Sequence, residues 1–182
     1  AVSPRSSLLY RSDAFKTKAI AANVTQLAVV VASRPSFSME LVQRCILAAE
    51  DQGIASLLVL NKADLPETPA ARERLNLLTR IGYPLVTLSA LTDVAPLRPA
   101  LHGHTTLLIG QSGMGKSTLI NTLAGERSAK TGDEPGITKT EQKIVLASDF
   151  HLFDTPGMLW PRIAVEESGY HLAASGGIGR NA

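Results

Sequence analysis

The sequence predicts an α/β protein with a doubly wound, mostly parallel sheet. Short apolar runs alternate along the chain with stretches of helical periodicity, which is the pattern of repeated β-α-β units. The runs are apolar at successive positions rather than at alternate ones, as expected of strands that helices cover on both faces. A length of 182 residues fits one domain built around such a sheet.

The expected elements follow one another regularly after a basic N-terminal stretch. Residues 1–24 show no clear period and are predicted to be a linker or arm, residues 25–176 the folded domain, and residues 177–182 a frayed tail. A turn at 148–149 should join the last two strands as a hairpin. The predicted strands are 26–32, 56–60, 85–88, 106–109, 142–147 and 151–153, and the predicted helices are 39–52, 69–81, 118–124 and 165–174.

One segment fits a phosphate-binding loop at every fixed position. Gly110-Gln-Ser-Gly-Met-Gly-Lys-Ser117 matches G-x-x-x-x-G-K-[ST] and lies between a predicted strand and a predicted helix. Its glycines allow backbone N–H groups to point at phosphate oxygens, and the next helix directs its positive dipole end at them. Lys116 should reach the β- and γ-phosphates, and Ser117 should bind Mg²⁺. The predicted phosphate-binding residues are Gly110, Gln111, Ser112, Gly113, Met114, Gly115, Lys116, Ser117 and Thr118.

Two further motifs follow strands at the same predicted edge, where doubly wound sheets bind ligands. In Asn61-Lys-Ala-Asp64, the aspartate can accept hydrogen bonds from two donors of guanine that adenine lacks. Alone, this tetrapeptide would more often be a capped helix start, so its interpretation depends on the phosphate loop. Ser89-Ala90 could offer a backbone N–H to the guanine carbonyl. The predicted guanine-binding residues are Asn61, Lys62, Asp64, Ser89 and Ala90.

A fourth motif, Asp154-Thr-Pro-Gly157, ends another predicted strand. Asp154 can hold Mg²⁺ through a water molecule, and the N–H of Gly157 can contact the γ-phosphate. A simple turn around Pro156 is the alternative.

Composition narrows the possible classes of protein. A hydrophobic content of 45% and a charged content of 19% are those of an ordinary globular protein, and a net charge of +2 does not require a nucleic-acid partner. The single cysteine, Cys45, excludes an internal disulfide and a cysteine-rich zinc module, and we expect it to be buried in a helix. The apolar runs are far shorter than the ~20 residues of a membrane span. We therefore expect a cytoplasmic protein, monomeric and without membrane contact.

With these four motifs the chain resembles translation-factor-type GTPases, but the guanine motifs precede the phosphate loop. That order is typical of circularly permuted GTPases, so the expected fold is a permuted P-loop GTPase fold. Residues from about 8 to 117 resemble the RsgA family of small-subunit maturation, through segments 9–13, 16–18, 21–24 and 110–117. Residues from about 118 to 182 resemble the YlqF/RbgA family, which acts on the large subunit, through segments 129–132, 134–139, 154–161 and 172–176. The seam falls within 115–121, which suggests a recombined or engineered chimeric G domain.

The resemblance implies Mg²⁺-dependent GTP binding and slow hydrolysis to GDP and phosphate, with a ribosomal subunit or rRNA as partner. The alternatives are a nucleotide-gated binding module with negligible turnover and an ATP-using kinase or ATPase. The resemblance also implies that Thr138, or else Thr140, closes over Mg²⁺ and the γ-phosphate, which makes Ser117, Thr138 and Asp154 the expected metal set. The YlqF-type loop has asparagine at the position of Gly113, so potassium dependence stays open.

The sequence identifies no catalytic residue. Where other GTPases have a glutamine that orients water, this chain has Met158, which makes no strong hydrogen bond. We expect His102, His104, His151 and His171 to be structural or exposed. Turnover without a partner should therefore be about 10⁻³ s⁻¹ or slower.

Overall fold

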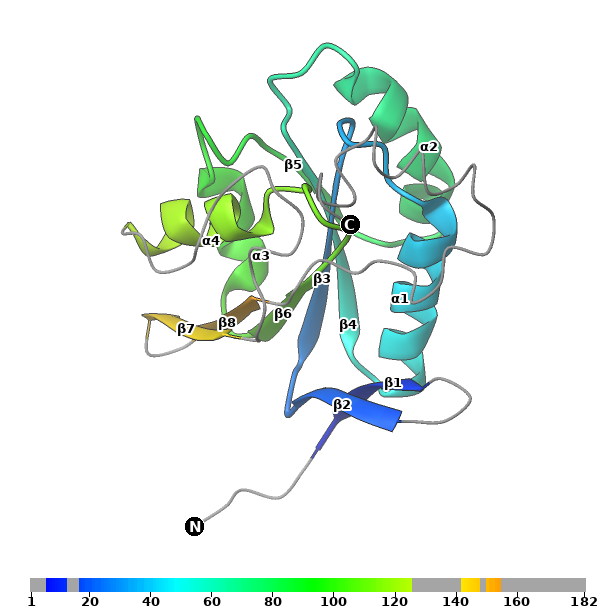
Figure 1. Ribbon diagram of the computed structural model, residues 1–182, viewed down its shortest axis with the longest axis vertical. Helices are drawn as coiled ribbons and strands as arrows, with labels where there is room; N and C mark the ends of the chain where they lie inside the picture. The colour runs from blue at the N-terminus through cyan, green and yellow to red at the C-terminus, as the bar shows by residue number, and fades with distance from the viewer. Residues whose placement is uncertain (1–5, 13–16, 126–141, 148–149, 155–182) are drawn as a thin grey trace, which may run out of the picture.

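The computed structural model describes residues 6–12, 17–125, 142–147 and 150–154. In these residues one sheet has the strand order β5-β4-β3-β6-β8-β7, and a separate small sheet pairs β1 with β2 (Figure 1). Strands β5, β4, β3, β6 and β8 run parallel to one another, and β7 is antiparallel to β8. The strands are β1 (Leu8–Ser12), β2 (Thr17–Ala22), β3 (Gln26–Ala32), β4 (Ala55–Asn61), β5 (Leu85–Thr87), β6 (Thr105–Ile109), β7 (Gln142–Ala147) and β8 (Phe150–Asp154).

Helices cover both faces of the large sheet. The helices α1 and α2 lie on one face and α3 and α4 on the other, as Figure 1 shows. All seven residues of β3 are buried, which explains why the six residues that follow Gln26 in this central strand are all apolar. The helical elements are α1 (Met39–Asp51), α2 (Thr68–Arg80), the 3₁₀ turn η1 (Ala95–Leu97), α3 (Arg98–Leu101) and α4 (Lys116–Ala124).

Local signals fix the helix ends. The Ser38 hydroxyl accepts a hydrogen bond from the Leu41 N–H at 3.3 Å and so caps α1. Pro69 lies in the first turn of α2, where its missing N–H costs nothing. Cys45 lies on the buried face of α1, as the sequence predicted, and burial raises the pKa of its thiol to about 12.

The chain order creates a crevice at the carboxyl ends of the central strands. From β3 the chain moves outward through β4 to β5 and then returns to β6 on the other side of β3. Loops that follow β3 and β6 therefore diverge, which is the position where doubly wound sheets bind ligands. The phosphate loop follows β6, Asn61 ends β4, Ser89 follows β5, and Asp154 ends β8.

The predicted fold class is confirmed, and so is the antiparallel pairing of the last two strands. Sequence patterns did not foresee β1 and β2 within residues 1–24, nor η1 and α3. The helix α4 begins at Lys116, two residues before the predicted start. The predicted turn at 148–149, the helix at 165–174 and the tail at 177–182 lie outside the described residues. No helix in the described part of the chain is long and apolar enough to cross a membrane.

Candidate nucleotide-binding site

The phosphate loop is held by close backbone packing as well as by glycine conformations. A Cβ on Gly110 would lie 2.3 Å from the carbonyl oxygen of Val30, so only glycine allows β6 to leave the sheet so close to β3. Gly115 has φ +83° and precedes the first residue of α4, and a Cβ there would lie 2.5 Å from Asn61 Nδ2. The loop therefore has the tight shape that the sequence motif requires.

Lys116 is buried against the start of its own loop. Its side chain is 6% exposed, and Nζ donates to the carbonyl oxygens of Gly110 at 2.9 Å and Gln111 at 3.1 Å. These carbonyls fix the ammonium group inside the loop rather than in solvent. Ser117 and Thr118 follow it in the first turn of α4, at the positive end of the helix dipole.

Asn61 connects the guanine motifs to the phosphate loop. Its Nδ2 donates to the carbonyl oxygen of Met114 at 2.9 Å, and its Oδ1 accepts from the Ala90 N–H at 2.9 Å. The side chain is 1% exposed, so both of its polar ends are satisfied in a site shielded from water. One buried amide thus joins three of the predicted motifs.

Asp64 stands at the exposed rim of the same edge. Its pKa is lowered from 3.8, first by the Ser89 hydroxyl, then by its own backbone N–H, and to a smaller extent by the Lys62 charge, while desolvation opposes the shift. The Ser89 hydroxyl lies near the carboxylate without meeting full hydrogen-bond geometry. Asp64 is therefore anionic at neutral pH and available as a hydrogen-bond acceptor.

The helix after the phosphate loop also supports the guanine side. Thr122 on α4 donates from Oγ1 to the carbonyl oxygen of Ala90 at 2.8 Å. The Ser89 carbonyl accepts from the backbone N–H groups of Thr92 at 3.1 Å and Asp93 at 3.0 Å. The Ser89-Ala90 turn is thus fixed from both sides, with its backbone at the ligand edge.

The predicted metal set is only partly within the described residues. Ser117 lies in the first turn of α4 beside Lys116, and Asp154 ends β8, which pairs with β6 through Phe153 and Leu107. The backbone therefore brings these two residues to one edge of the sheet. A hydroxyl and a carboxylate suit Mg²⁺, which binds few protein ligands beside phosphate oxygens and water. Among the described residues there is no group of three or more His, Cys, Asp or Glu that could hold a metal ion. Thr138, Thr140, Gly157 and Met158 lie outside the described residues.

Sequence reasoning missed the β3–α1 loop (residues 33–38) as a part of this site. Its Ser38 N–H donates to Gln111 Oε1 at 2.6 Å, and a Cβ on Gly113 would lie 3.0 Å from Pro35 Cγ. The position of this loop in the chain could have identified it, because the loop follows the central strand β3, where the strand order reverses and doubly wound sheets bind ligands.

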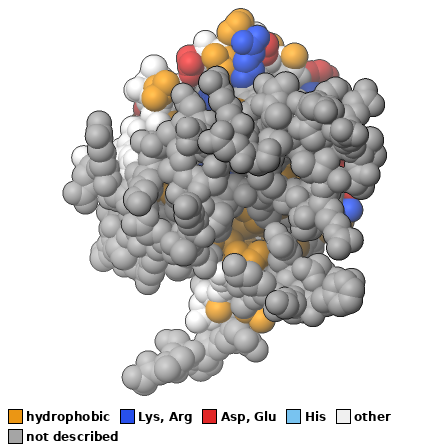
Figure 2. All heavy atoms as spheres, in the orientation of Figure 1, with side chains coloured by type: hydrophobic (Ala, Val, Ile, Leu, Met, Phe, Trp, Pro, Cys, Tyr) orange, Lys and Arg blue, Asp and Glu red, His pale blue; other side chains and the backbone are white. Residues whose placement is uncertain are grey.

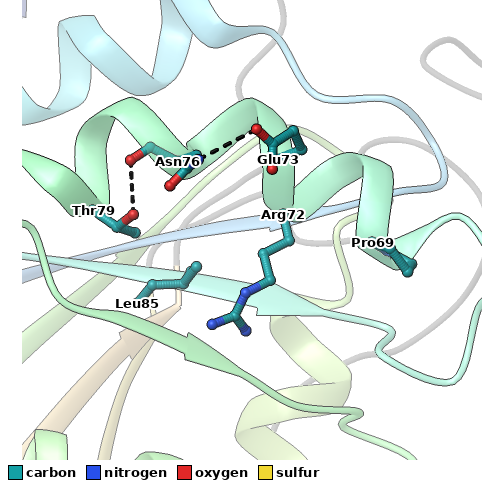
Figure 3. Close-up of a pocket in the computed structure, with 6 residues that line it drawn as sticks. All are labelled: Pro69, Arg72, Glu73, Asn76, Thr79 and Leu85. Carbon is teal, nitrogen blue, oxygen red and sulfur yellow. Dashed lines mark hydrogen bonds between the residues drawn. The ribbon is translucent and has the colours of Figure 1, made fainter.

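In the view of Figure 2, the side chains coloured at the upper end of the molecule include charged ones of both signs beside hydrophobic ones. A separate hollow of about 400 Å³ lies between α2 and β5 (Figure 3). Arg72 reaches from α2 toward β5 in this hollow and donates from Nη1 to Thr87 Oγ1 at 3.2 Å. None of the predicted site residues lines it. The lining residues are Pro69, Arg72, Glu73, Asn76, Thr79 and Leu85.

Comparison with known proteins agrees with this geometry. Residues 2–163 match the RsgA GTPase family. A Neisseria meningitidis protein named small ribosomal subunit biogenesis GTPase RsgA is 52% identical over 162 residues, covering 85% of this chain and 53% of its own length. A Nitrosospira multiformis protein of the same name is 45% identical over 163 residues, covering 85% of this chain and 52% of its own. The chain thus spans about half the length of these relatives.

Solved structures show the same architecture. The crystal structure of YjeQ from Thermotoga maritima aligns with a TM-score of 0.63 and 28% identity, over 86% of this chain and 54% of that one. YloQ, described as a circularly permuted GTPase, aligns with a TM-score of 0.56 and 21% identity, over 86% of this chain and 57% of that one. The latter likeness concerns the fold alone. In this chain, too, the strand that ends at Asn61 precedes the strand that leads into the phosphate loop.

The family match also bears on the expected seam within residues 115–121. It continues without interruption from residue 2 to residue 163, so one family accounts for both sides of that segment. A chimera of two families therefore has no support in these comparisons. The chain belongs to the RsgA GTPase family.

Proposed function

We propose that this chain binds GTP and GDP with Mg²⁺ at the carboxyl edge of the sheet and hydrolyses GTP slowly. The observation that carries this proposal is the buried Asn61 side chain, which joins Met114 of the phosphate loop to the Ala90 N–H. A phosphate cradle and a base site are thereby held at a fixed separation, with anionic Asp64 at the base side. An ATP-using enzyme has no need of this carboxylate, which suits the donors of guanine.

Each predicted residue has a proposed task in this site. The N–H groups of 110–118 and of Gly157 bind phosphate oxygens, and Lys116 turns its ammonium from the loop carbonyls toward them. Asp64 accepts from guanine, Lys62 flanks the base, and Asn61, Ser89 and Ala90 hold the base side in place. Ser117, Thr138 and Asp154 hold Mg²⁺, which supplies neutralisation of the developing phosphate charge when bound.

The biological setting is proposed from the relatives. They are named small ribosomal subunit biogenesis GTPases, so we propose that the chain acts on the small subunit or its rRNA, in the cytoplasm and as a monomer. We propose residues 25–176 as the GTPase domain, residues 1–24 as an arm that includes β1 and β2, and 177–182 as a tail.

A competition experiment tests the nucleotide assignment. A fluorescent GDP analogue bound to the chain would be displaced by unlabelled GDP, GTP, ATP or xanthosine diphosphate in the presence of Mg²⁺. We expect displacement by GDP and GTP at concentrations at least a hundredfold lower than by ATP, because each charged hydrogen bond lost contributes about 1.5–3 kcal/mol. Equal displacement by ATP and GTP would contradict the proposal.

A further inference from the structure

The β3–α1 loop connects the two parts of the nucleotide site. On the phosphate side, its Ser38 N–H donates to the Gln111 side chain at 2.6 Å, and Pro35 packs where Gly113 has no side chain. On the guanine side, Lys62 Nζ donates to the carbonyl oxygen of Arg34 at 2.9 Å. Any displacement of this loop would therefore disturb both the phosphate loop and the Asn61–Asp64 segment.

Helix α2 holds the same loop from its outer side at two points. Glu67, directly before α2, forms an ion pair with Arg34, and Arg74 reaches the loop seven residues later. Seven residues are about two helical turns, so both side chains project from one face of α2. In Figure 1 the loop lies at the upper end of β3, beside the start of α2.

Arg74 makes the stronger of these two attachments. Its Nη2 donates to the Phe37 carbonyl at 2.7 Å, its Nη1 donates to Ser36 Oγ at 3.0 Å, and its guanidinium lies 4.1 Å from the centre of the Phe37 ring. Phe37 is itself 3% exposed, so this anchor is fixed in the core. The side chains of the Arg34–Glu67 pair are 72% and 37% exposed, and exposed ion pairs contribute little.

We propose that Arg74 is a positioning residue for nucleotide binding. By fixing Ser36 and Phe37, it holds Ser38 against Gln111 and Pro35 against Gly113, and so keeps the phosphate loop in its binding shape. It acts through the loop and not by contact with nucleotide. A preorganised loop has less conformational freedom to lose on binding, so the affinity depends on Arg74. This inference rests on the nucleotide binding proposed above.

Arg74→Ala and Arg74→Lys test the role, with Arg72→Ala as the matched control. Arg72 lies on the same helix and is also exposed, but it donates to Thr87 in the hollow beside β5. We expect Arg74→Ala to weaken binding of a fluorescent GDP analogue about tenfold, mainly through faster dissociation, and Arg72→Ala to leave it unchanged. Arg74→Lys keeps the charge but loses the two-pronged geometry, so it should recover only part of the affinity.

Two measurements separate positioning from general stability. In the ³¹P spectrum of bound GDP, the β-phosphate resonance should move in the Arg74 variants and stay in place in Arg72→Ala. In a double-mutant cycle with Gln111→Met, the combined loss of affinity should be smaller than the product of the two single losses, because both act through one loop.

The possible outcomes distinguish a failure of the proposed function from a failure of the positioning role. Wild-type protein that fails to bind GDP would overturn the proposed function. If wild type binds GDP and both folded Arg74 variants bind it with the same affinity, only the positioning role is overturned. The same holds if the losses of affinity from Arg74→Ala and Gln111→Met multiply in the double-mutant cycle. If Arg74→Ala does not fold, Arg74→Lys carries the test.

Discussion

Two residues of one tetrapeptide have opposite surroundings. Asn61 is buried and uses both ends of its amide inside the protein, whereas Asp64 is exposed at the rim of the site, with its carboxylate near the Ser89 hydroxyl. Loss of Asn61 would leave buried groups of Met114 and Ala90 without partners and so affect stability as well as binding. Loss of the Asp64 charge should affect only the recognition of base, which makes Asp64 the better probe of function.

Asp64→Asn should lower affinity for GDP and shift preference toward xanthosine diphosphate. An amide can donate to the second carbonyl of xanthine but cannot accept from both guanine donors. The expected loss for GDP is about 1.5–3 kcal/mol for each charged hydrogen bond. Isothermal titration of wild type and variant against both nucleotides measures it, and Asp51→Asn, at the far end of α1, is the control. Undiminished GDP affinity in Asp64→Asn would remove the base-reading role.

Lys116→Ala and Ser117→Ala should differ in their response to Mg²⁺. Lys116 is proposed to contribute charge directly to the phosphates, so its loss should weaken GTP binding with and without metal. Ser117 is expected to act through Mg²⁺, so its loss should remove mainly the enhancement that the metal provides. Titration of a fluorescent GTP analogue with Mg²⁺ and with chelator separates the two. A Ser117 variant that retains full Mg²⁺ enhancement would refute the ligand role.

At the scale of elements, buried strands with a continuous apolar pattern could be predicted to within about a residue at each end. The run 26–32 became β3 with the same bounds, because all seven of its residues are buried and six of them are apolar, so no exposed polar position obscures its limits. The strands β1 and β2 were missed because their residues mix basic and apolar types without a clear period, and the two strands are joined by pairing between separate segments. Such pairing between separate segments leaves no local pattern in the sequence.

The contacts among loops could not be predicted for a similar reason. The sequence motifs identified Asn61 and Gly115 but not that Asn61 lies against Gly115, nor that Arg74 on α2 supports the β3–α1 loop. These contacts depend on how neighbouring strands are ordered in the sheet, and a β-α-β pattern alone leaves that order open. Motifs identify residues by type and spacing, whereas the contacts that support these residues follow only from the fold.

The two ends of α4 offer a comparison of glycines. Gly115 and Gly125 both have positive φ, at +83° and +71°, but a Cβ on Gly125 would meet nothing within 4 Å, whereas one on Gly115 would collide with Asn61 Nδ2. Gly125→Ala should therefore cost only about 1–2 kcal/mol of backbone strain. Gly115→Ala should cause backbone strain of the same kind, should also displace Asn61, and should therefore abolish measurable nucleotide binding. Urea unfolding and GDP titration of both variants measure this, and equal nucleotide affinity in the two would contradict the account.

At the scale of the whole molecule, chain order and spatial order are separate. The guanine motifs precede the phosphate loop in the chain, yet parallel strands in the order β4-β3-β6-β8 bring the motifs to one edge of the sheet. A permuted order leaves the site intact because its geometry depends on strand neighbours rather than on the position of the termini. Because of this permuted order, the β3–α1 loop and α2 come early in the chain, whereas the phosphate loop that the β3–α1 loop contacts comes much later.

The last prediction concerns turnover, which depends on groups beyond those that bind nucleotide. Met158 stands where a glutamine would orient water, and His104, one of the described histidines, is held away from the ligand edge, within 3.3 Å of Thr25 Oγ1 at the start of β3. A missing group that stabilises transition-state charge costs about 10³–10⁵ in rate. We therefore expect single-turnover phosphate release at roughly 10⁻³ s⁻¹ or below from the isolated chain.

If a partner supplies the missing group, small ribosomal subunits should raise this rate and large subunits should not. A rate near 1 s⁻¹ without any partner would show that the chain contains a complete catalytic group, and stimulation by large subunits alone would reverse the proposed choice of subunit.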